Sequence, residues 1–191
     1  MMQVKRFSLA EYHQLIELGF FRESDRLELI SGEIMEKAPQ SKPHATCLRK
    51  LMREFPTLVS NKATLQTHAP ISVPPNSEPE PDFAIIKNRE DNYLSSHPTP
   101  ADVLLLIEVA DYSLEYDQKV KLPLYAQAGI TDYWIINLLD NYLECYSNPS
   151  PTQLGKFGYL TKRIVLPTQV IALPCFPDLS LDLTKIFLPR K

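Results

Sequence analysis

The feature that most constrains the fold of this 191-residue sequence is the run Val103–Ala110, in which Glu108 is the single polar residue among apolar ones. An apolar run of this length without alternation is typical of a strand that is covered on both faces. An ionised carboxylate inside such a strand must shift its pKa, pair with a cation or bind a metal ion. We interpret Glu108 as a cation ligand, which predicts a functional site at the centre of the fold. A buried ion pair with Lys121, without metal, is the structural alternative.

Helix and strand patterns lie on both sides of this run. A capping box that starts at Ser8 predicts a helix from Leu9, and residues 26–36 alternate as a hairpin around Ser31-Gly32. A loop is expected over 148–155. Further helices are expected over 44–60 and 117–128, and further strands over 64–73, 81–87, 133–137, 142–146, 159–165 and 170–173. This order predicts an α/β fold, an α+β mixed sheet flanked by helices, with strands 103–110 and 133–137 parallel.

The composition predicts one globular domain over residues 1–191. Hydrophobic residues make up 44% and charged residues 23% of the chain, which excludes a disordered protein. The net charge of −3 disfavours a protein that coats nucleic acid non-specifically, although it allows a local basic groove. Three widely spaced cysteines favour neither a disulfide framework nor a zinc site. Together with the lack of a long apolar run, they predict a cytoplasmic protein without a membrane partner.

Several short motifs occur together and in a fixed order. They are Pro81-Asp82, Ile107-Glu108-Val109, Asp117-x-x-x-Lys121-Leu122-Pro123-Leu124-Tyr125-Ala126 and Gly129-Ile130-x-x-Tyr133-Trp134. In combination they resemble the Uma-type restriction endonuclease family, which belongs to the PD-(D/E)XK nuclease superfamily. Further matches at Glu28–Glu33, at His44 and at Glu78–Asp82 extend the resemblance from about residue 7 to about residue 187.

The resemblance implies a restriction endonuclease-like core and a Mg²⁺-dependent endonuclease that hydrolyses phosphodiester bonds of DNA, with Mn²⁺ as a substitute metal. By resemblance, Asp82 and Glu108 hold the metal, Lys121 positions water or stabilises the transition state, and Glu28 is either an additional metal ligand or a residue that supports the ligands from behind. His44 and Lys119 are accessory candidates. These residue types suit the chemistry, because Mg²⁺ prefers oxygen ligands and an ammonium can stabilise an anionic transition state. Cutting two antiparallel strands favours a homodimer.

One departure from the superfamily pattern affects this interpretation. The usual lysine lies two residues after the glutamate, where this chain has Ala110, so that Lys121 on the following helix takes its place. Structural alternatives exist for the other residues: Asp82 can end a turn, Lys121 and Glu28 can be solvated, and His44 can cap a helix. A catalytically silent nuclease-like binding or assembly module is therefore the main alternative function. A metal-assisted hydrolase of small phosphoesters is a third, and would require a closed pocket.

Overall fold

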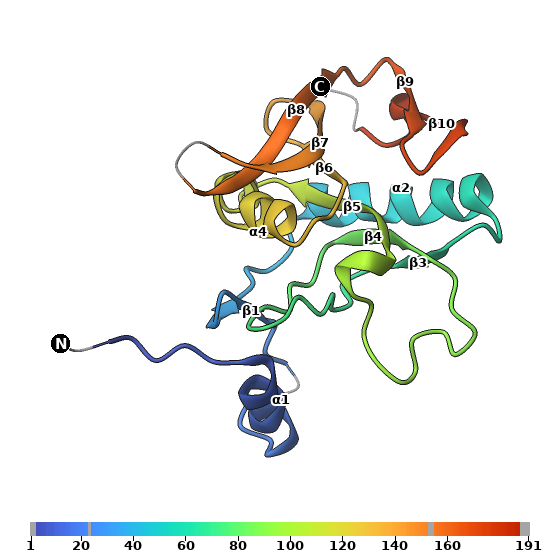
Figure 1. The fold of residues 1–191 in the computed structure, drawn as a ribbon. Helices are drawn as coiled ribbons and strands as arrows, with labels where there is room; N and C mark the ends of the chain where they lie inside the picture. The colour runs from blue at the N-terminus through green and yellow to red at the C-terminus, as the bar shows by residue number, and fades with distance from the viewer. Residues whose placement is uncertain (1–2, 23, 153–154, 188–191) are drawn as a thin grey trace.

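A mixed sheet forms the centre of the protein (Figure 1). The computed structural model describes residues 3–22, 24–152 and 155–187, and within these the sheet has six strands in the order β3-β4-β5-β6-β7-β8. Only the β5–β6 pair is parallel, as predicted, and every other neighbouring pair in this sheet is antiparallel. The strands are β3 (Thr64–Gln66), β4 (Phe83–Ile86), β5 (Val103–Ala110), β6 (Asp132–Asn137), β7 (Tyr142–Pro151) and β8 (Phe157–Val165).

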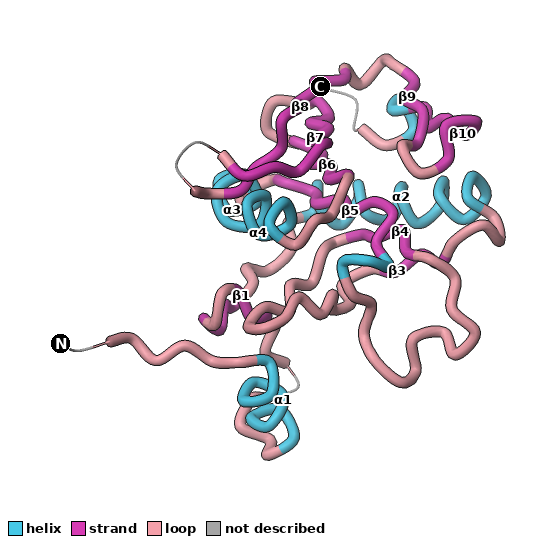
Figure 2. Tube along the Cα trace, viewed as in Figure 1, coloured by secondary structure: helices cyan, strands magenta, loops and turns pink. Residues whose placement is uncertain are grey.

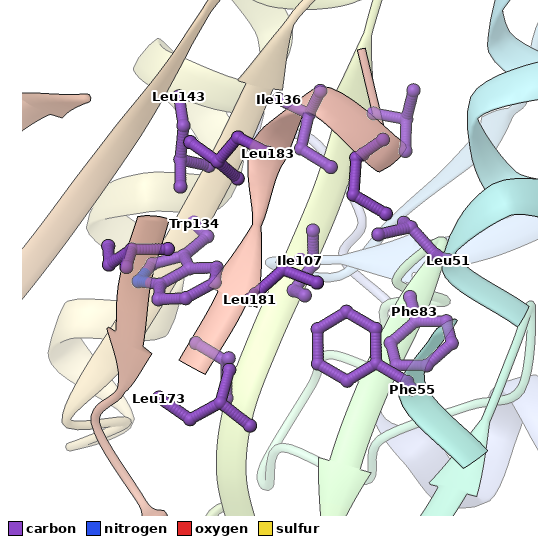
Figure 3. Close-up of a cluster of buried hydrophobic side chains, with 14 of the residues drawn as sticks. Leu51, Phe55, Phe83, Ile107, Trp134, Ile136, Leu143, Leu173, Leu181 and Leu183 are labelled. Carbon is purple, nitrogen blue, oxygen red and sulfur yellow. The ribbon is translucent and has the colours of Figure 1, made fainter. Parts of the chain in front are cut away.

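The first face of the sheet is covered by α2 (Lys42–Val59) together with the C-terminal β9 (Val170–Leu173), β10 (Phe176–Asp182) and η3 (Leu183–Lys185). Ser41 caps α2, because its side chain accepts a hydrogen bond from the His44 N–H. Pro43 is tolerated in the first turn of α2, because an N–H at this position would have no partner within the helix. Phe55 of α2 contacts Phe83 of β4, and both side chains are buried beside Ile107 (Figure 3). Leu105, Ile107 and Val109 of β5 therefore face α2, whereas Val103 packs on the other face of the sheet.

The second face of the sheet is covered by one helical segment that follows β5. It consists of α3 (Leu114–Tyr116), a π-helical turn η2 (Asp117–Lys121) and α4 (Leu122–Gln127), drawn in helix colour in Figure 2. The predicted helix over 117–128 is thus present, and it begins three residues earlier. The π turn lies directly before Pro123, whose ring and missing N–H disturb regular α-helical hydrogen bonding. Gly129, with φ +78°, follows the helix as expected.

An N-terminal unit lies beside the sheet and contains α1 (Leu9–Glu17), β1 (Leu27–Ile30) and β2 (Glu33–Glu36) (Figure 1). The predicted capping box and hairpin are both present. Ser31 and Gly32 both have positive φ, as a two-residue hairpin turn requires. The hairpin is joined to the chain before β4, because the Glu78 N–H donates to the Leu29 carbonyl at 2.7 Å.

Two expected boundaries are wrong, and one strand was not expected. The strand over 64–73 ends at Gln66, because His68 has φ +48° and Pro70 cannot donate a hydrogen bond. β7 continues to Pro151 through the expected loop, of which residues 153–154 lie outside the described residues. Pro149 and Pro151 are tolerated there because β6 pairs with β7 only up to Ser147, which leaves one side of β7 without a strand partner. β10 was not expected.

No helix in the described part of the chain is long and apolar enough to cross a membrane.

Candidate active site

The two motif carboxylates lie opposite each other on neighbouring strands. Phe83 of β4 pairs with Ile107 of β5, so that the next residues in the antiparallel register are Asp82 and Glu108. The Asp82 N–H donates to Glu108 Oε2 at 3.2 Å, and the Val109 N–H donates to Asp82 Oδ2 at 2.9 Å. Asp82 is 7% exposed and Glu108 is 2% exposed. Strand pairing therefore fixes both acidic groups at one buried point.

Lys121 lies between two acidic side chains. Its Nζ donates to Glu108 Oε1 at 2.9 Å and lies 3.4 Å from Glu28 Oε2. The Lys121 residue is 3% exposed, and it is the last residue of the π turn. The lysine expected by resemblance thus reaches the glutamate from the following helix, although Ala110 occupies the usual position on the strand.

Hydroxyl and backbone groups hold the acidic side chains from other directions. Tyr125 of α4 donates from its hydroxyl to Glu108 Oε1 at 3.0 Å. Glu28 accepts at Oε1 from the Tyr116 hydroxyl at 3.1 Å, and at Oε2 from the Glu80 N–H at 3.0 Å. Glu28 is only 1% exposed. It is therefore a member of the buried cluster and not a solvated hairpin carboxylate.

Two histidines flank Asp82. His44 Nε2 lies 2.9 Å from Asp82 Oδ2, and His68 Nδ1 lies 3.5 Å from Asp82 Oδ1. The two imidazole rings are stacked with their centroids 6.4 Å apart. His44 thus combines the capping position at the start of α2 with a side-chain contact to the site. His68 lies outside the sequence motifs described above.

Burial is the largest single influence on the pKa values of the cluster, but neighbouring charges outweigh it for Asp82 and Lys121. Burial raises the pKa of Glu108 to about 8, although Lys121 acts in the opposite direction. Burial also acts to raise the pKa of Asp82, but the hydrogen bond and charge of His44 and the charge of Lys121 outweigh it and lower the pKa to about 2. Burial acts to lower the pKa of Lys121, whereas Glu108 and Glu28 raise it well above 10.5. The site therefore contains a firmly ionised Asp82 beside a Glu108 that gains a proton readily.

These side chains form the floor of a pocket of about 310 Å³. One wall comes from residues 35–41, between β2 and α2, and the other from residues 111–117, between β5 and the π turn. Lys119 does not line this pocket. Its side chain is 71% exposed and pairs with Glu115 at 2.6 Å. Among the accessory candidates, the structure therefore brings His44 into the site and leaves Lys119 outside.

Another buried carboxylate, Glu144 of β7, contacts the π turn. Gln118 Nε2 donates to both Glu144 oxygens, at 3.0 and 2.9 Å, and Lys162 of β8 lies 2.8 Å away. The Tyr146 hydroxyl donates to the same carboxylate. Because Gln118 lies in the same turn as Lys121, this network ties the lysine-bearing helix to the sheet.

Sequence reasoning missed several members of these networks. The spacing of Lys121 and Tyr125, four residues apart, is a signal that both lie on one side of a helix. No comparable signal links His68 to Asp82 or Glu144 to Gln118, because these partners lie far apart in the chain.

The mixed sheet with helices on both faces has the restriction endonuclease-like fold. A crystal structure described as "a putative nuclease belonging to DUF820 from Anabaena variabilis" has this fold. It matches with a TM-score of 0.73 and 16% sequence identity, over 95% of this chain and 97% of that chain. The family model of Uma2, described as "Putative restriction endonuclease", matches residues 9–184. The chain therefore belongs to the Uma2 family. No curated protein matches it.

Proposed function

We propose that this protein is a Mg²⁺-dependent endonuclease that hydrolyses phosphodiester bonds of DNA. The observation that carries the proposal is the convergence of Asp82, Glu108 and Lys121 on the floor of one pocket, from two strands and a helix. A silent domain has no physical need for this arrangement, because burying carboxylates carries a desolvation cost. Family membership and fold support nuclease chemistry independently of these residues.

The donor set fits Mg²⁺. Within residues 3–22, 24–152 and 155–187, no group of three or more His, Cys, Asp and Glu side chains is arranged to hold a metal ion. Mg²⁺ does not need such a cage, because it keeps several waters and is commonly bound by one or two carboxylates together with substrate phosphates. Asp82 and Glu108 would hold the ion through oxygen atoms, and Mn²⁺ would accept the same ligands.

When bound, the metal would lower the pKa of a coordinated water and offset charge on the phosphate oxygens. The protein residues prepare this site. Lys121 provides a fixed ammonium that positions water or stabilises the anionic transition state, and Glu28 keeps that ammonium in place. His44 orients Asp82, and Tyr125 orients Glu108. In this arrangement Glu28 acts through Lys121 and is not itself placed as a third metal ligand.

One observation favours the alternative of a catalytically silent binding or assembly module. Both oxygens of Glu108 accept hydrogen bonds from protein groups, namely Lys121, Tyr125 and the Asp82 N–H. A stable ion-pair network of this kind satisfies the buried groups by itself. The two functions therefore differ in whether a cation competes successfully for these oxygens.

Metal titration and plasmid cleavage distinguish these functions. We expect Mg²⁺ or Mn²⁺ to bind the wild type and to support nicking of plasmid DNA, and Asp82→Ala and Glu108→Ala to lose both. Lys119→Met serves as the control, because Lys119 is exposed outside the pocket. Equal, weak metal binding by wild type and variants, with no nicking, would falsify the nuclease proposal. Cleavage of a small phosphodiester in preference to DNA would favour a small-substrate hydrolase instead.

The homodimer and the single domain stay predictions. Light scattering tests the first, since a mass of one protomer in solution would contradict it.

A further inference from the structure

Tyr112 is an exposed aromatic residue on the wall of the acidic pocket. It is 86% exposed, lies four residues after Glu108, and belongs to the segment 111–117 that lines the pocket. A single exposed aromatic side chain is common on protein surfaces and has no meaning by itself. Tyr112 is of interest because it lies beside the acidic pocket.

The backbone on both sides of Tyr112 is anchored. Asp111 accepts a hydrogen bond from Ser41 at 2.5 Å, which connects this wall to the start of α2 across the pocket. Ser113 donates to Asp117 at 2.6 Å, which connects it to the π turn below. The loop is therefore held at two points while the aromatic ring between them remains in solvent. Such a ring can stack on a ligand without first ordering its own backbone.

The pocket has the size and lining of a site for one nucleotide. Its volume of about 310 Å³ is at the lower end of the range for small-ligand pockets, which is roughly 300–1,000 Å³. Met35 and Pro39 make part of its lining apolar, and Arg26 adds positive charge. Because Glu108 on the floor is 2% exposed, a phosphate must enter the pocket to reach it. An intact duplex holds its bases in a continuous stack and presents no free base to Tyr112.

We propose that Tyr112 stacks on the base of an unpaired nucleotide whose phosphate reaches Asp82 and Glu108. The substrate class is then DNA with an unpaired nucleotide, either single-stranded or extruded from a duplex. This inference rests on the proposed nuclease function and adds the form of DNA that the site accepts. Aromatic stacking suits any base, so it predicts little sequence preference at this position.

Binding of fluorescently labelled oligonucleotides to the full-length protein tests this role, with Ca²⁺, which also takes carboxylate oxygens as ligands, in place of Mg²⁺ to slow cleavage. We expect the wild type to bind a single strand more tightly than the same sequence as an intact duplex. Tyr112→Ala should weaken single-strand binding about 5- to 150-fold, which is the effect expected from the loss of one stacked base. Tyr112→Phe should stay within about twofold of the wild type because it keeps the ring.

Two controls separate stacking from general damage. Phe20→Ala removes an aromatic side chain that is 72% exposed and does not line the pocket, so it should leave binding unchanged. On a single strand made entirely of abasic nucleotides, Tyr112→Ala should bind as well as the wild type, because no base is left to stack on. A duplex with one unpaired nucleotide should bind more tightly than the intact duplex if extrusion supplies the base.

The outcomes separate this inference from the proposed function. A wild type that cleaves DNA, but whose single-strand binding is unchanged by Tyr112→Ala, would overturn the stacking role and leave the nuclease proposal standing. Tighter binding to intact duplex than to single strand would also overturn it. A wild type that binds single strands through Tyr112 and never cleaves them with Mg²⁺ would instead refute the nuclease proposal.

Discussion

Replacing Lys121 by methionine tests whether its ammonium compensates the buried carboxylates. The substitution keeps most of the side-chain volume and removes the charge between Glu108, at 2.9 Å, and Glu28, at 3.4 Å. Both glutamates are at most 2% exposed, so water cannot replace the ammonium. Removing one partner of a buried ion pair costs about 3–5 kcal/mol of stability. We expect Lys121→Met to lower the free energy of unfolding by an amount in this range.

The size of this loss depends on pH. Burial already raises the pKa of Glu108 to about 8, and losing Lys121 raises it further. At pH 5 the carboxyl takes up a proton, which limits the destabilisation, whereas above pH 8 more of the wild-type carboxyl is ionised and depends on the ammonium. The destabilisation by Lys121→Met should therefore be larger at pH 8 than at pH 5.

Urea unfolding at both pH values measures these differences. Trp134 is the single tryptophan of the chain and is 3% exposed, so its fluorescence reports loss of the core. Lys119→Met is the matched control, because it removes the same chemical group from an exposed position two residues away. Equal effects of Lys121→Met and Lys119→Met on the unfolding free energy would refute the reasoning.

Three further predictions concern other buried or strained groups. The folded-state pKa of Glu108, about 8, lies above its ordinary value of 4.5, so its contribution to stability is present at low pH and is lost as pH rises through about 8. Glu108→Gln should flatten the dependence of unfolding free energy on pH between 5 and 8; parallel curves for variant and wild type would contradict this. We expect Glu144→Ala to lower the free energy of unfolding, measured in urea, by about 3 kcal/mol, because it leaves buried donors without an acceptor. A loss below about 1 kcal/mol would contradict a stabilising role of the Glu144 network. We expect Gly32→Ala to lower the thermal unfolding midpoint more than Gly129→Ala. Both glycines have positive φ, but only at Gly32 would a Cβ atom meet a neighbour, Arg6 Cβ at 2.7 Å. Equal shifts would show that backbone strain alone causes the destabilisation.

The strands of the core were predicted well where the apolar pattern was uninterrupted. β5 runs over Val103–Ala110 as expected, and β9 over Val170–Leu173. The failures lie where tertiary context decides whether an extended segment has a partner. Pro149 and Pro151 indicate a loop by local chemistry, yet they extend β7 because β8 supplies hydrogen bonds on one side and no strand is needed on the other.

The candidate site was predicted in part. Asp82, Glu108, Lys121 and Glu28 do converge, and His44 joins them. The site also contains partners that no local pattern indicates. His68 reaches Asp82 from an irregular segment after β3, where backbone conformation and not periodicity sets the direction of the side chain.

The sequence alone determined the elements of this protein, because a hydrophobic period is a local property that is written into neighbouring residues. It also placed a carboxylate inside an apolar strand, where burial makes the charged form costly. Only the tertiary structure decided which groups surround the buried carboxylate and compensate its charge. The antiparallel register of β4 and β5 brings Asp82 to Glu108, and the π turn before Pro123 brings Lys121 between Glu108 and Glu28. Distances between residues far apart in the chain follow from packing, which no local pattern contains.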